Sequence, residues 1–468
     1  MNRIANNAQH KESKYADVLK DWSLKMSMPD KKMKEVFKDK YLKYANVVGS
    51  TCSSCGSGLF KKDYARTFHP QIKNNRPIRE LIWLFENRRN SRKIWELLPE
   101  IGYDISDVSS NDFEEIEAYL KNSQSLTFDT VIMDEASKAT PPELILPLCY
   151  GKKSVIIGDH RQLPPMLNNK DFKETLEEIE AFDLAKEIDE EFTGTSIFER
   201  LIENPKVSPS IKSTFHEQYR MHSDINSVID QFYVDEGGLR PGAPILEHQD
   251  DPDLDNPFSR YHGFLNEEFI NPDVHTIWVN VDEPEEKSGT SRINEGEVKA
   301  VKSVLQYLKN AENFEAFQNH WSSLKNEDKR RQEQEIGIIS FYFHQLKKLR
   351  EVTKYAKNSL DIPVRLKTVD KFQGMERNII IVSTVRSNKI LQGGHVRPNR
   401  DIGFAKAPER LNVALSRARR LLVVVGNLDF FYNYKDKNGN TIYRNAIDMI
   451  KKNGKIIKDY KSLNKYAQ

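Results

Sequence analysis

Two apolar segments of the chain end in polar side chains whose types suit phosphate chemistry. Residues 131–133 are followed by Asp134 and Glu135, and residues 156–157 are followed by a turn that contains Gln162. An aspartate can hold Mg²⁺ through the water shell of the ion, and an adjacent glutamate can orient and deprotonate an attacking water. The amide of Gln162 can sense a terminal phosphate. Together these residues predict a nucleoside triphosphate hydrolase.

The loop that commonly cradles the phosphates is missing from this sequence. No G-x-x-x-x-G-K-S/T pattern occurs in the 468 residues. Residues 49–58 contain glycines without a Gly-Lys-Ser/Thr run, and Gly151-Lys152-Lys153 lacks both the upstream glycine and the hydroxyl. We interpret both segments as structural.

Composition limits the class of protein. The formal net charge is only +2 although 30% of the residues are charged, so any nucleic-acid site must be a local basic stripe. No apolar run approaches the roughly 20 residues that span a bilayer, and residues 1–20 lack the apolar core of a signal peptide. Three cysteines in so long a chain indicate a reducing compartment. We therefore expect a cytoplasmic protein with no membrane partner.

The cysteines themselves have two interpretations. Cys52 and Cys55 have the spacing of a redox pair or of half a zinc site, but no second pair and no histidine cluster accompanies them, and Cys149 stands alone. We interpret them as thiols at the end of a buried strand.

Hydrophobic patterning predicts two sheets. Residues 128–133 and 154–157 are short runs of mostly apolar residues, typical of parallel strands that are covered on both faces. Residues 45–51 form an earlier strand-like run. Helical patterns separate several of the later strand candidates, which favours a second parallel α/β sheet. These candidates are residues 276–281, 336–341, 365–369, 378–383 and 421–425.

The remaining segments have plainer interpretations. A turn-rich stretch around residue 205 predicts a domain boundary. The others are expected to be a lysine-rich helical lead-in (1–44), helices (60–125), an acidic helix (172–191), a long surface loop (237–273), a charged helical stretch with a solvated face (309–335) and a solvated basic tail (451–465).

Two groups in the second half suit a nucleotide. Tyr219 and Arg220 precede a helix expected from residue 224 with Ser223 as its cap, and they can stack on a base and reach a γ-phosphate. Gly374 follows a strand and allows the backbone to approach a phosphate, while Glu376 can complete the outer ligand shell of a metal ion.

A third group consists of two arginines. Residues 410–419 are expected to form a helix, on which Arg410 and Arg417 lie nearly two turns apart and point the same way. Two such arginines suit a triphosphate, and an arginine finger contributes about 10³–10⁵ in rate in other phosphoryl-transfer enzymes.

These groups occur in one order along the chain, and together they resemble superfamily 1 helicases. The resemblance is to the group of the nonsense-mediated-decay (Upf-like) RNA helicase and its DNA-acting relatives, and it covers roughly residues 45–58 and 126–428. The matching motifs are Asp134-Glu135-Ala136-Ser137, Gly158-Asp159 with Gln162-Leu163-Pro164-Pro165, Ser196-Ile197-Phe198-Glu199-Arg200, Gln218-Tyr219-Arg220-Met221-His222, Asn294 with Glu297, Ile336-Gly337-Ile338-Ile339-Ser340 with Gln345, Val369-Asp370 with Phe372-Gln373-Gly374 and Glu376, Ser383-Thr384-Val385-Arg386, and Arg410-Leu411-Asn412-Val413-Ala414 with Ser416-Arg417-Ala418.

The resemblance implies an α/β fold of two RecA-like parallel-sheet domains, with ATP and Mg²⁺ in the cleft between them. The first domain would comprise residues 45–205, incomplete at its N-terminal side and carrying a helical insertion at about 60–125. The second would comprise residues 206–468. The implied nucleotide positions are Asp134 for the magnesium, Glu135 for the hydrolytic base, Gln162 for the γ-phosphate sensor, Arg220 and Arg417 for the arginines of the second domain, Tyr219 beside the base, and Gly374 and Glu376 in the nucleotide-facing loop, to which we add Arg410.

The resemblance also implies a track for single-stranded DNA or RNA across the top of both domains, held mainly through phosphates and sugars. The residues at positions near the nucleic-acid backbone are Thr51, Ser53, Ser383, Thr384 and Arg386. Travel from 5′ to 3′ rests on the resemblance alone.

Departures from the family pattern shape the expected function. Ser223 stands where the family usually has proline, and Ser340-Phe341 stands where it has Thr-Pro. The phosphate loop should precede residue 45. We expect the carboxyl-terminal two-thirds of a helicase of this group, a fragment or split form that hydrolyses ATP poorly alone and that a chain carrying the missing loop would complete. The alternative is a non-catalytic module that binds nucleic acid or a protein partner. A metal nuclease using Asp134 and Glu135 is a third, weaker possibility because it leaves the arginines without a role.

Overall fold

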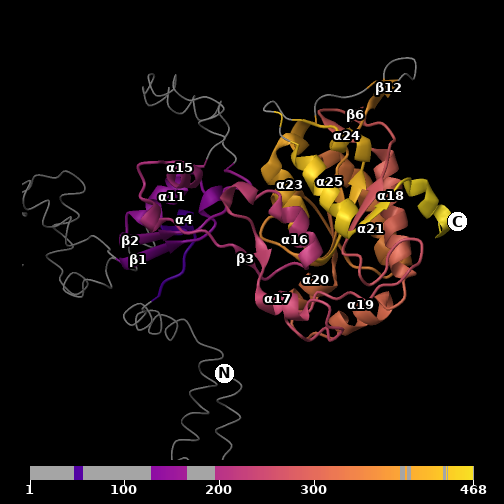
Figure 1. The fold of residues 1–468 in the computed structure, drawn as a ribbon, viewed down its shortest axis with the longest axis horizontal. Helices are drawn as coiled ribbons and strands as arrows, with labels where there is room; N and C mark the ends of the chain where they lie inside the picture. Colours follow the sequence, from indigo (N-terminus) through magenta and orange to yellow (C-terminus); the bar gives the residue numbers. More distant parts are fainter. Residues whose placement is uncertain are drawn as a thin grey trace, which may run out of the picture. The chain divides into compact units, whose positions relative to one another are not determined.

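A computed structural model describes residues 47–55, 128–165, 196–390, 396–397, 402–435, 439 and 441–466. The predicted lead-in, the helical insertion and the acidic helix at 172–191 lie outside these residues. The chain divides into two compact units, residues 1–157 and 158–468 (Figure 1). The domain boundary expected near residue 205 stays a prediction. Among the helices described, none is both long and apolar enough to cross a membrane.

The first unit contains a parallel strand pair. Strand β1 (Phe128–Met133) pairs with β2 (Gly151–Ile156), and helix α11 (Pro141–Leu148) connects them. The start of α11 is fixed by Thr140, whose backbone N–H and side-chain O–H both donate to the Glu143 carboxylate (3.0 and 2.8 Å). Both strands were predicted. Because β2 begins at Gly151, the Gly-Lys-Lys run is part of a strand.

Three expectations for this unit are wrong. Ile132 and Val155 are 67% and 47% exposed, so the described residues do not cover both faces of β1 and β2. Residues 47–50 form no strand, and the next residues form the short helix α4 (Cys52–Cys55). Cys55 is buried and lies on this helix rather than at the end of a strand. All three cysteines are free thiols.

The second unit is built on a six-stranded sheet in which every neighbouring pair is parallel, as predicted. The order of its strands is β14 (Lys455–Ile457), β5 (Thr276–Asn280), β13 (Ala418–Gly426), β10 (Arg377–Ser383), β8 (Ile336–Ser340) and β9 (Val364–Thr368). The five strands predicted from apolar runs are all present, and each end falls within three residues of its prediction.

Helices cover both faces of this sheet (Figure 1). Successive strand residues point to opposite faces, so Ile379 and Ile381 belong to one core and Ile380 and Val382 to the other. The first core is closed by α18 (Glu295–Lys309), α19 (Phe314–Ser322) and α21 (Phe343–Ser359). The second is closed by α16 (Ser223–Asp230), α22 (Val369–Phe372), α23 (Pro408–Leu415), α24 (Leu428–Tyr432) and α25 (Ile442–Asn453).

Short elements complete the described chain. They are η3 (Ala136–Lys138), α15 (Ile197–Glu203), η4 (Pro209–Ile211), β3 (Glu217–Gln218), η5 (Val234–Glu236), β4 (Arg240–Pro241), α17 (Ala243–His248), β6 (Glu286–Ser288), β7 (Ser291–Ile293), α20 (Glu327–Gln334), β11 (Lys389–Ile390), β12 (Val396–Arg397), η6 (Gly403–Lys406) and η7 (Tyr460–Tyr466).

Three plainer interpretations of the sequence are wrong in part. The segment 237–273 is no surface loop, because Phe264 and Phe269 are fully buried in the first core. The charged stretch 309–335 buries Phe317 and Trp321 in the same core. The basic tail contains the edge strand β14. In each segment a few large apolar side chains are buried within an otherwise polar sequence. They are too widely spaced to give the periodic pattern by which a helix or strand is predicted from sequence.

Candidate functional site

The two carboxylates after β1 are both exposed. Glu135 has a left-handed backbone (φ 55°), which is uncommon for a residue other than glycine and marks a strained turn. The Asp134 carboxylate accepts a hydrogen bond from the Glu135 N–H (2.9 Å). This turn presents both carboxylates to solvent. Such oxygens are the ligands that a hard divalent cation takes, so these residues fit a magnesium site.

Gln162 belongs to a hydrogen-bonded network within the second unit. Its amide nitrogen donates to Asp159 (2.7 Å), which also accepts from the Tyr233 hydroxyl (2.6 Å). Asn412 donates to the Tyr233 oxygen (2.9 Å), and Arg417 Nη2 donates to Gln162 Oε1 (3.3 Å). Burial and the Asp159 charge raise the pKa of Tyr233, so its hydroxyl stays a donor. The predicted phosphate sensor is therefore held in a defined orientation against a predicted arginine.

The expected pairing of Arg410 with Arg417 on one helix is wrong. Helix α23 ends at Leu415, so Arg417 lies beyond it. Arg417 is buried and donates to the Val413 carbonyl (3.0 Å) and the Ser416 hydroxyl (2.8 Å). Arg410 instead lies 3.6 Å from Asp370 and over the Phe404 ring. The wrong prediction arose because a helical repeat in the sequence does not show where the helix ends.

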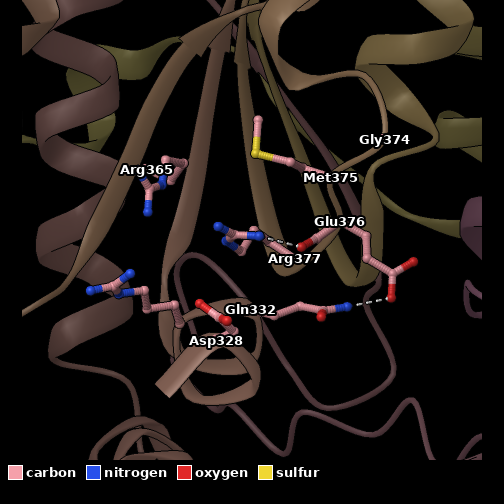
Figure 2. Close-up of a pocket in the computed structure, with 8 residues that line it drawn as sticks. Asp328, Gln332, Arg365, Gly374, Met375, Glu376 and Arg377 are labelled. Atoms are coloured by element: carbon pink, nitrogen blue, oxygen red, sulfur yellow. Dashed lines mark hydrogen bonds between the residues drawn. The ribbon is translucent and has the colours of Figure 1, made fainter. Parts of the chain in front are cut away.

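Arg220 and Glu376 are brought together from distant segments. Arg220 Nε donates to Glu376 Oε2 (2.8 Å), and Gln332 donates to Glu376 Oε1 (2.8 Å), the second contact being visible in Figure 2. Burial raises the pKa of Glu376, but the charges of Arg419 (4.0 Å) and Arg220 outweigh it, so the pKa lies below its ordinary value. Glu376 is consequently a carboxylate at neutral pH.

A pocket of about 310 Å³ lies beside this pair (Figure 2). Gly374 lines it with a left-handed backbone (φ 79°), and a Cβ at this position would meet no atom within 4 Å. The loop backbone is therefore open to a ligand, as expected for close approach to a phosphate or sugar. The pocket is lined by Asp328, Arg331, Gln332, Arg365, Gly374, Met375, Glu376 and Arg377.

Tyr219 is placed as a base-stacking platform would be. Its side chain is 52% exposed, and its hydroxyl donates to Glu217 (3.1 Å). The ring lies directly against Gly242, where a Cβ would collide with it. The helix that follows is α16, and its cap is His222, which accepts from the Asp224 N–H (3.1 Å), rather than Ser223 as predicted.

Three of the predicted nucleic-acid residues are buried. Ser383 and Thr384 donate to the carboxylate of Glu297 (2.6 and 3.2 Å). Arg386 pairs with Glu285 (2.6 Å) and donates to the Tyr342 hydroxyl (3.1 Å). Their contact with nucleic acid stays a prediction, and here these side chains hold the protein interior together.

Two other predicted nucleic-acid residues, Thr51 and Ser53, lie in the first unit and are exposed. Thr51 accepts from the Ser54 N–H (3.3 Å) at the start of α4. Their assignment to nucleic acid stays a prediction.

Several site residues escaped the sequence reasoning. Asn412 lies within a quoted motif, and its place between two arginines was an available signal. Tyr233 and Gln332 carried no such signal, because only the fold brings Tyr233 to Asp159 and Gln332 to Glu376.

A histidine cluster near this site does not fit a metal ion. His222, Asp250 and His275 can each bring one ligand atom within 4.8 Å of the others. However, the rings of His222 and His275 are stacked at 3.5 Å, so their nitrogen lone pairs lie in parallel planes instead of converging. Burial, His262 and Arg260 lower the pKa of His222 to about 3, and the buried cation that helps to lower it would also repel a metal.

Comparison with known proteins agrees with this geometry. A protein-family model described as an AAA domain matches residues 193–429, and a second with the same description matches residues 115–170. DNA polymerase alpha-associated DNA helicase A of Saccharomyces cerevisiae is 30% identical over 324 residues, 64% of this chain and 38% of that protein. ATP-dependent helicase upf1 of Schizosaccharomyces pombe is 29% identical over 64% of this chain and 27% of that protein. Helicase sen1 of the same yeast is 31% identical over 65% and 15%.

The chain thus spans 38% or less of the length of these relatives. Among solved structures, the helicase nonstructural protein 10 of an arterivirus matches with a TM-score of 0.23 at 10% identity, over 63% of this chain and 38% of that one, a likeness too weak to support a conclusion. The match to the first family model covers just over half of the chain. The six-stranded sheet of the second unit is the parallel α/β sheet of a RecA-like helicase domain. The family implies ATP and a divalent cation as cofactors. The chain belongs to the AAA domain family and, within it, to the Upf1-like group of superfamily 1 helicases.

Proposed function

We propose that this chain works in ATP-dependent translocation along single-stranded nucleic acid, as part of a superfamily 1 helicase. The observation that supports this most is the network that joins Arg417 to Gln162 (3.3 Å) and Gln162 to Asp159 (2.7 Å). A buried arginine in contact with an oriented amide is the arrangement needed to register the presence of a terminal phosphate. The names of the similar proteins, which include DNA and ATP-dependent helicases, agree with this function.

The proposed roles follow the chemistry of each side chain. Arg417 and Arg220 contact the phosphates of ATP. Gln162 contacts the terminal phosphate, and its hydrogen bond to Asp159 links that contact to the rest of the network. Tyr219 stacks on the base, and the backbone at Gly374 approaches the nucleotide beside Glu376. Arg410 is proposed to contact the nucleotide as well, and its pairing with Asp370 gives it a structural role.

Asp134 and Glu135 complete the proposed chemistry. Asp134 would hold Mg²⁺, which when bound neutralises phosphate charge, and Glu135 would orient and deprotonate the attacking water. We propose residues 45–205 and 206–468 as the parts of the first and second RecA-like domains. Three free thiols agree with a cytoplasmic location.

Nucleotide binding tests this proposal better than turnover, because the chain spans only part of its relatives. We expect Arg220→Ala and Arg417→Ala each to weaken the binding of a fluorescent ATP analogue at least tenfold, as charged phosphate contacts are lost. Arg444→Ala is a matched control, since that arginine contacts Tyr432 and lies in no site residue's network. Equal binding by all four proteins would contradict the proposal.

The absence of a G-x-x-x-x-G-K-S/T motif from the 468 residues favours a second candidate, a module that binds nucleic acid without turnover. This candidate predicts that an oligonucleotide binds with the same affinity whether or not ATP is present. Coupling between the two ligands would favour the translocase instead.

A further inference from the structure

Helix α21 carries a line of cations along its solvent face that the nucleotide site does not use. The spacing of four, three, four and three residues places all members on one face of an α-helix. The opposite face packs Leu349, Val352 and Ala356 into the core. The exposed line, which we call the α21 stripe, consists of Phe343, Lys347, Arg350, Lys354 and Lys357.

The cations of the α21 stripe have no acidic partner among the residues that the structure describes. Within the described part of the chain none of the four forms an ion pair, whereas Lys348, off the stripe, pairs with Glu295 (2.6 Å). Like charges three or four residues apart destabilise a helix by a few tenths of a kcal/mol each. In a chain with a net charge of only +2, this concentration of unneutralised cations indicates a polyanionic ligand.

Phe343 supplies the second observation. It is 54% exposed at the first position of α21, with Lys347 Nζ 5.1 Å from the ring centroid. The next residue fixes its position, since His344 Nδ1 lies 2.9 Å from the Ser288 hydroxyl and the His344 N–H donates to Ser291 (3.3 Å). An exposed, anchored aromatic beside a cation is suited to stacking on a nucleic-acid base.

The position of Phe343 in the fold agrees with this use. Strand β8 ends at Ser340, so Phe343 lies at the carboxyl edge of a parallel sheet, where ligands of such folds bind. From there α21 (Figure 1) runs back along the sheet, and its four cations extend over about 15 Å between Lys347 and Lys357.

We propose that the α21 stripe binds single-stranded nucleic acid, with a base stacked on Phe343 and phosphates on Lys347, Arg350, Lys354 and Lys357. This inference rests on the proposed action on nucleic acid and adds a path along the flank of the second unit. Phosphate contacts carry no base readout, so the stripe binds without sequence preference.

Salt dependence tests the cations. The affinity for a fluorescein-labelled single-stranded oligonucleotide is measured at several salt concentrations for the wild-type chain and for a variant with the four stripe cations changed to Gln. We expect the slope of log affinity against log salt to fall by about 0.7 per lost cation, near 3 in all. A control changes four exposed lysines elsewhere, Lys299, Lys325, Lys329 and Lys452, to Gln, and is expected to shift the slope far less. Equal slopes for the two variants overturn the inference.

Base stacking tests Phe343. Phe343→Ala should weaken binding of a base-bearing oligonucleotide roughly tenfold, leave an abasic oligonucleotide almost unaffected, and be rescued by Phe343→Tyr. Phe215→Ala, at a more exposed aromatic (81%), serves as the control. Equal loss with the abasic strand overturns the stacking role.

If polyglutamate binds with the same affinity and the same dependence on the stripe, the ligand is an acidic protein instead and the inference fails. If the wild-type chain binds no oligonucleotide, the proposed function fails with it; if it does bind and the stripe variant behaves like the control, only the inference fails.

Discussion

Arg220 and Glu376, separated by 156 positions in the sequence, form an ion pair with 2.8 Å between Arg220 Nε and Glu376 Oε2. The carboxylate is also held by Gln332 from α20. A phosphate that is to bind Arg220 must therefore compete with a carboxylate already in place. If Arg220 binds a phosphate of ATP as proposed, breaking this ion pair is part of the free energy of nucleotide binding.

This relationship predicts that Glu376→Gln tightens nucleotide binding. The amide cannot compete as strongly for the guanidinium, so we expect an affinity several-fold higher for a fluorescent ATP analogue in equilibrium titrations. Gln332→Ala removes only the hydrogen bond that Gln332 donates to Glu376, and it should raise the affinity by a smaller factor. A loss of affinity in Glu376→Gln would show that the carboxylate itself holds the nucleotide.

The Glu297 carboxyl should make stability depend on pH. Burial raises its pKa to about 8, against the lowering effect of hydrogen bonds from Ser383, Val385 and Thr384. Between about pH 4.5 and pH 8 the folded chain then holds a proton that the unfolded chain lacks. The free energy of unfolding therefore falls as the pH rises through this window. Urea denaturation at pH 5 and pH 8 should show a larger drop for the wild type than for Glu297→Gln, and equal drops would contradict the raised pKa.

Arg386→Ala should act on stability before it acts on nucleic acid. The side chain of Glu285 is completely buried and would lose its closest cation. Leaving one partner of a buried ion pair without its counter-charge lowers the free energy of unfolding by about 3–5 kcal/mol. We expect a loss of this order, reduced by the remaining Arg292 at 3.6 Å, in urea denaturation. The double variant Glu285→Gln with Arg386→Met should recover much of it. A stable Arg386→Ala chain with weakened oligonucleotide binding would instead support a direct contact.

Gly242→Ala should impair recognition of the base alone. The added methyl group collides with the Tyr219 ring and must push it from its place. We expect competition titrations to show weaker ATP binding with unchanged binding of inorganic triphosphate, which has no base. Gly49→Ala, whose added methyl meets no atom within 4 Å, is the matched control. Parallel losses for both ligands would mean that the substitution disturbs more than the stacking platform.

The 468-residue chain alone should hydrolyse ATP at or near the background rate, even with single-stranded nucleic acid present. The G-x-x-x-x-G-K-S/T pattern does not occur in these 468 residues, so by themselves they would not supply the backbone amides and the lysine with which such a loop positions a triphosphate and neutralises its charge. Phosphate release is the measurement. Robust hydrolysis that disappears in Glu135→Gln would show that another segment does the work of the loop.

The sequence predicted the strands of the second sheet well because the centre of a strand buried on both faces must be a continuous apolar run, as residues 379–382 are. For the site, the sequence indicated residue types that suit phosphate chemistry, and their roles stay predictions. It could not predict that Arg417 lies beyond α23, since helical spacing carries no information about where a helix ends. Nor could it pair Gln332 with Glu376, because sheet order alone decides which distant segments meet.

The place of β5 in the sheet has a consequence for the nascent chain. This strand comes first in sequence among the six, yet it lies between β13 and β14, the last two to be synthesised. Its apolar residues Ile277, Trp278 and Val279 leave the ribosome well over a hundred residues before their first neighbour at residue 418 exists. At about 5–20 residues per second, that delay lasts roughly 7 to 28 seconds. We expect chaperones to hold this strand during translation.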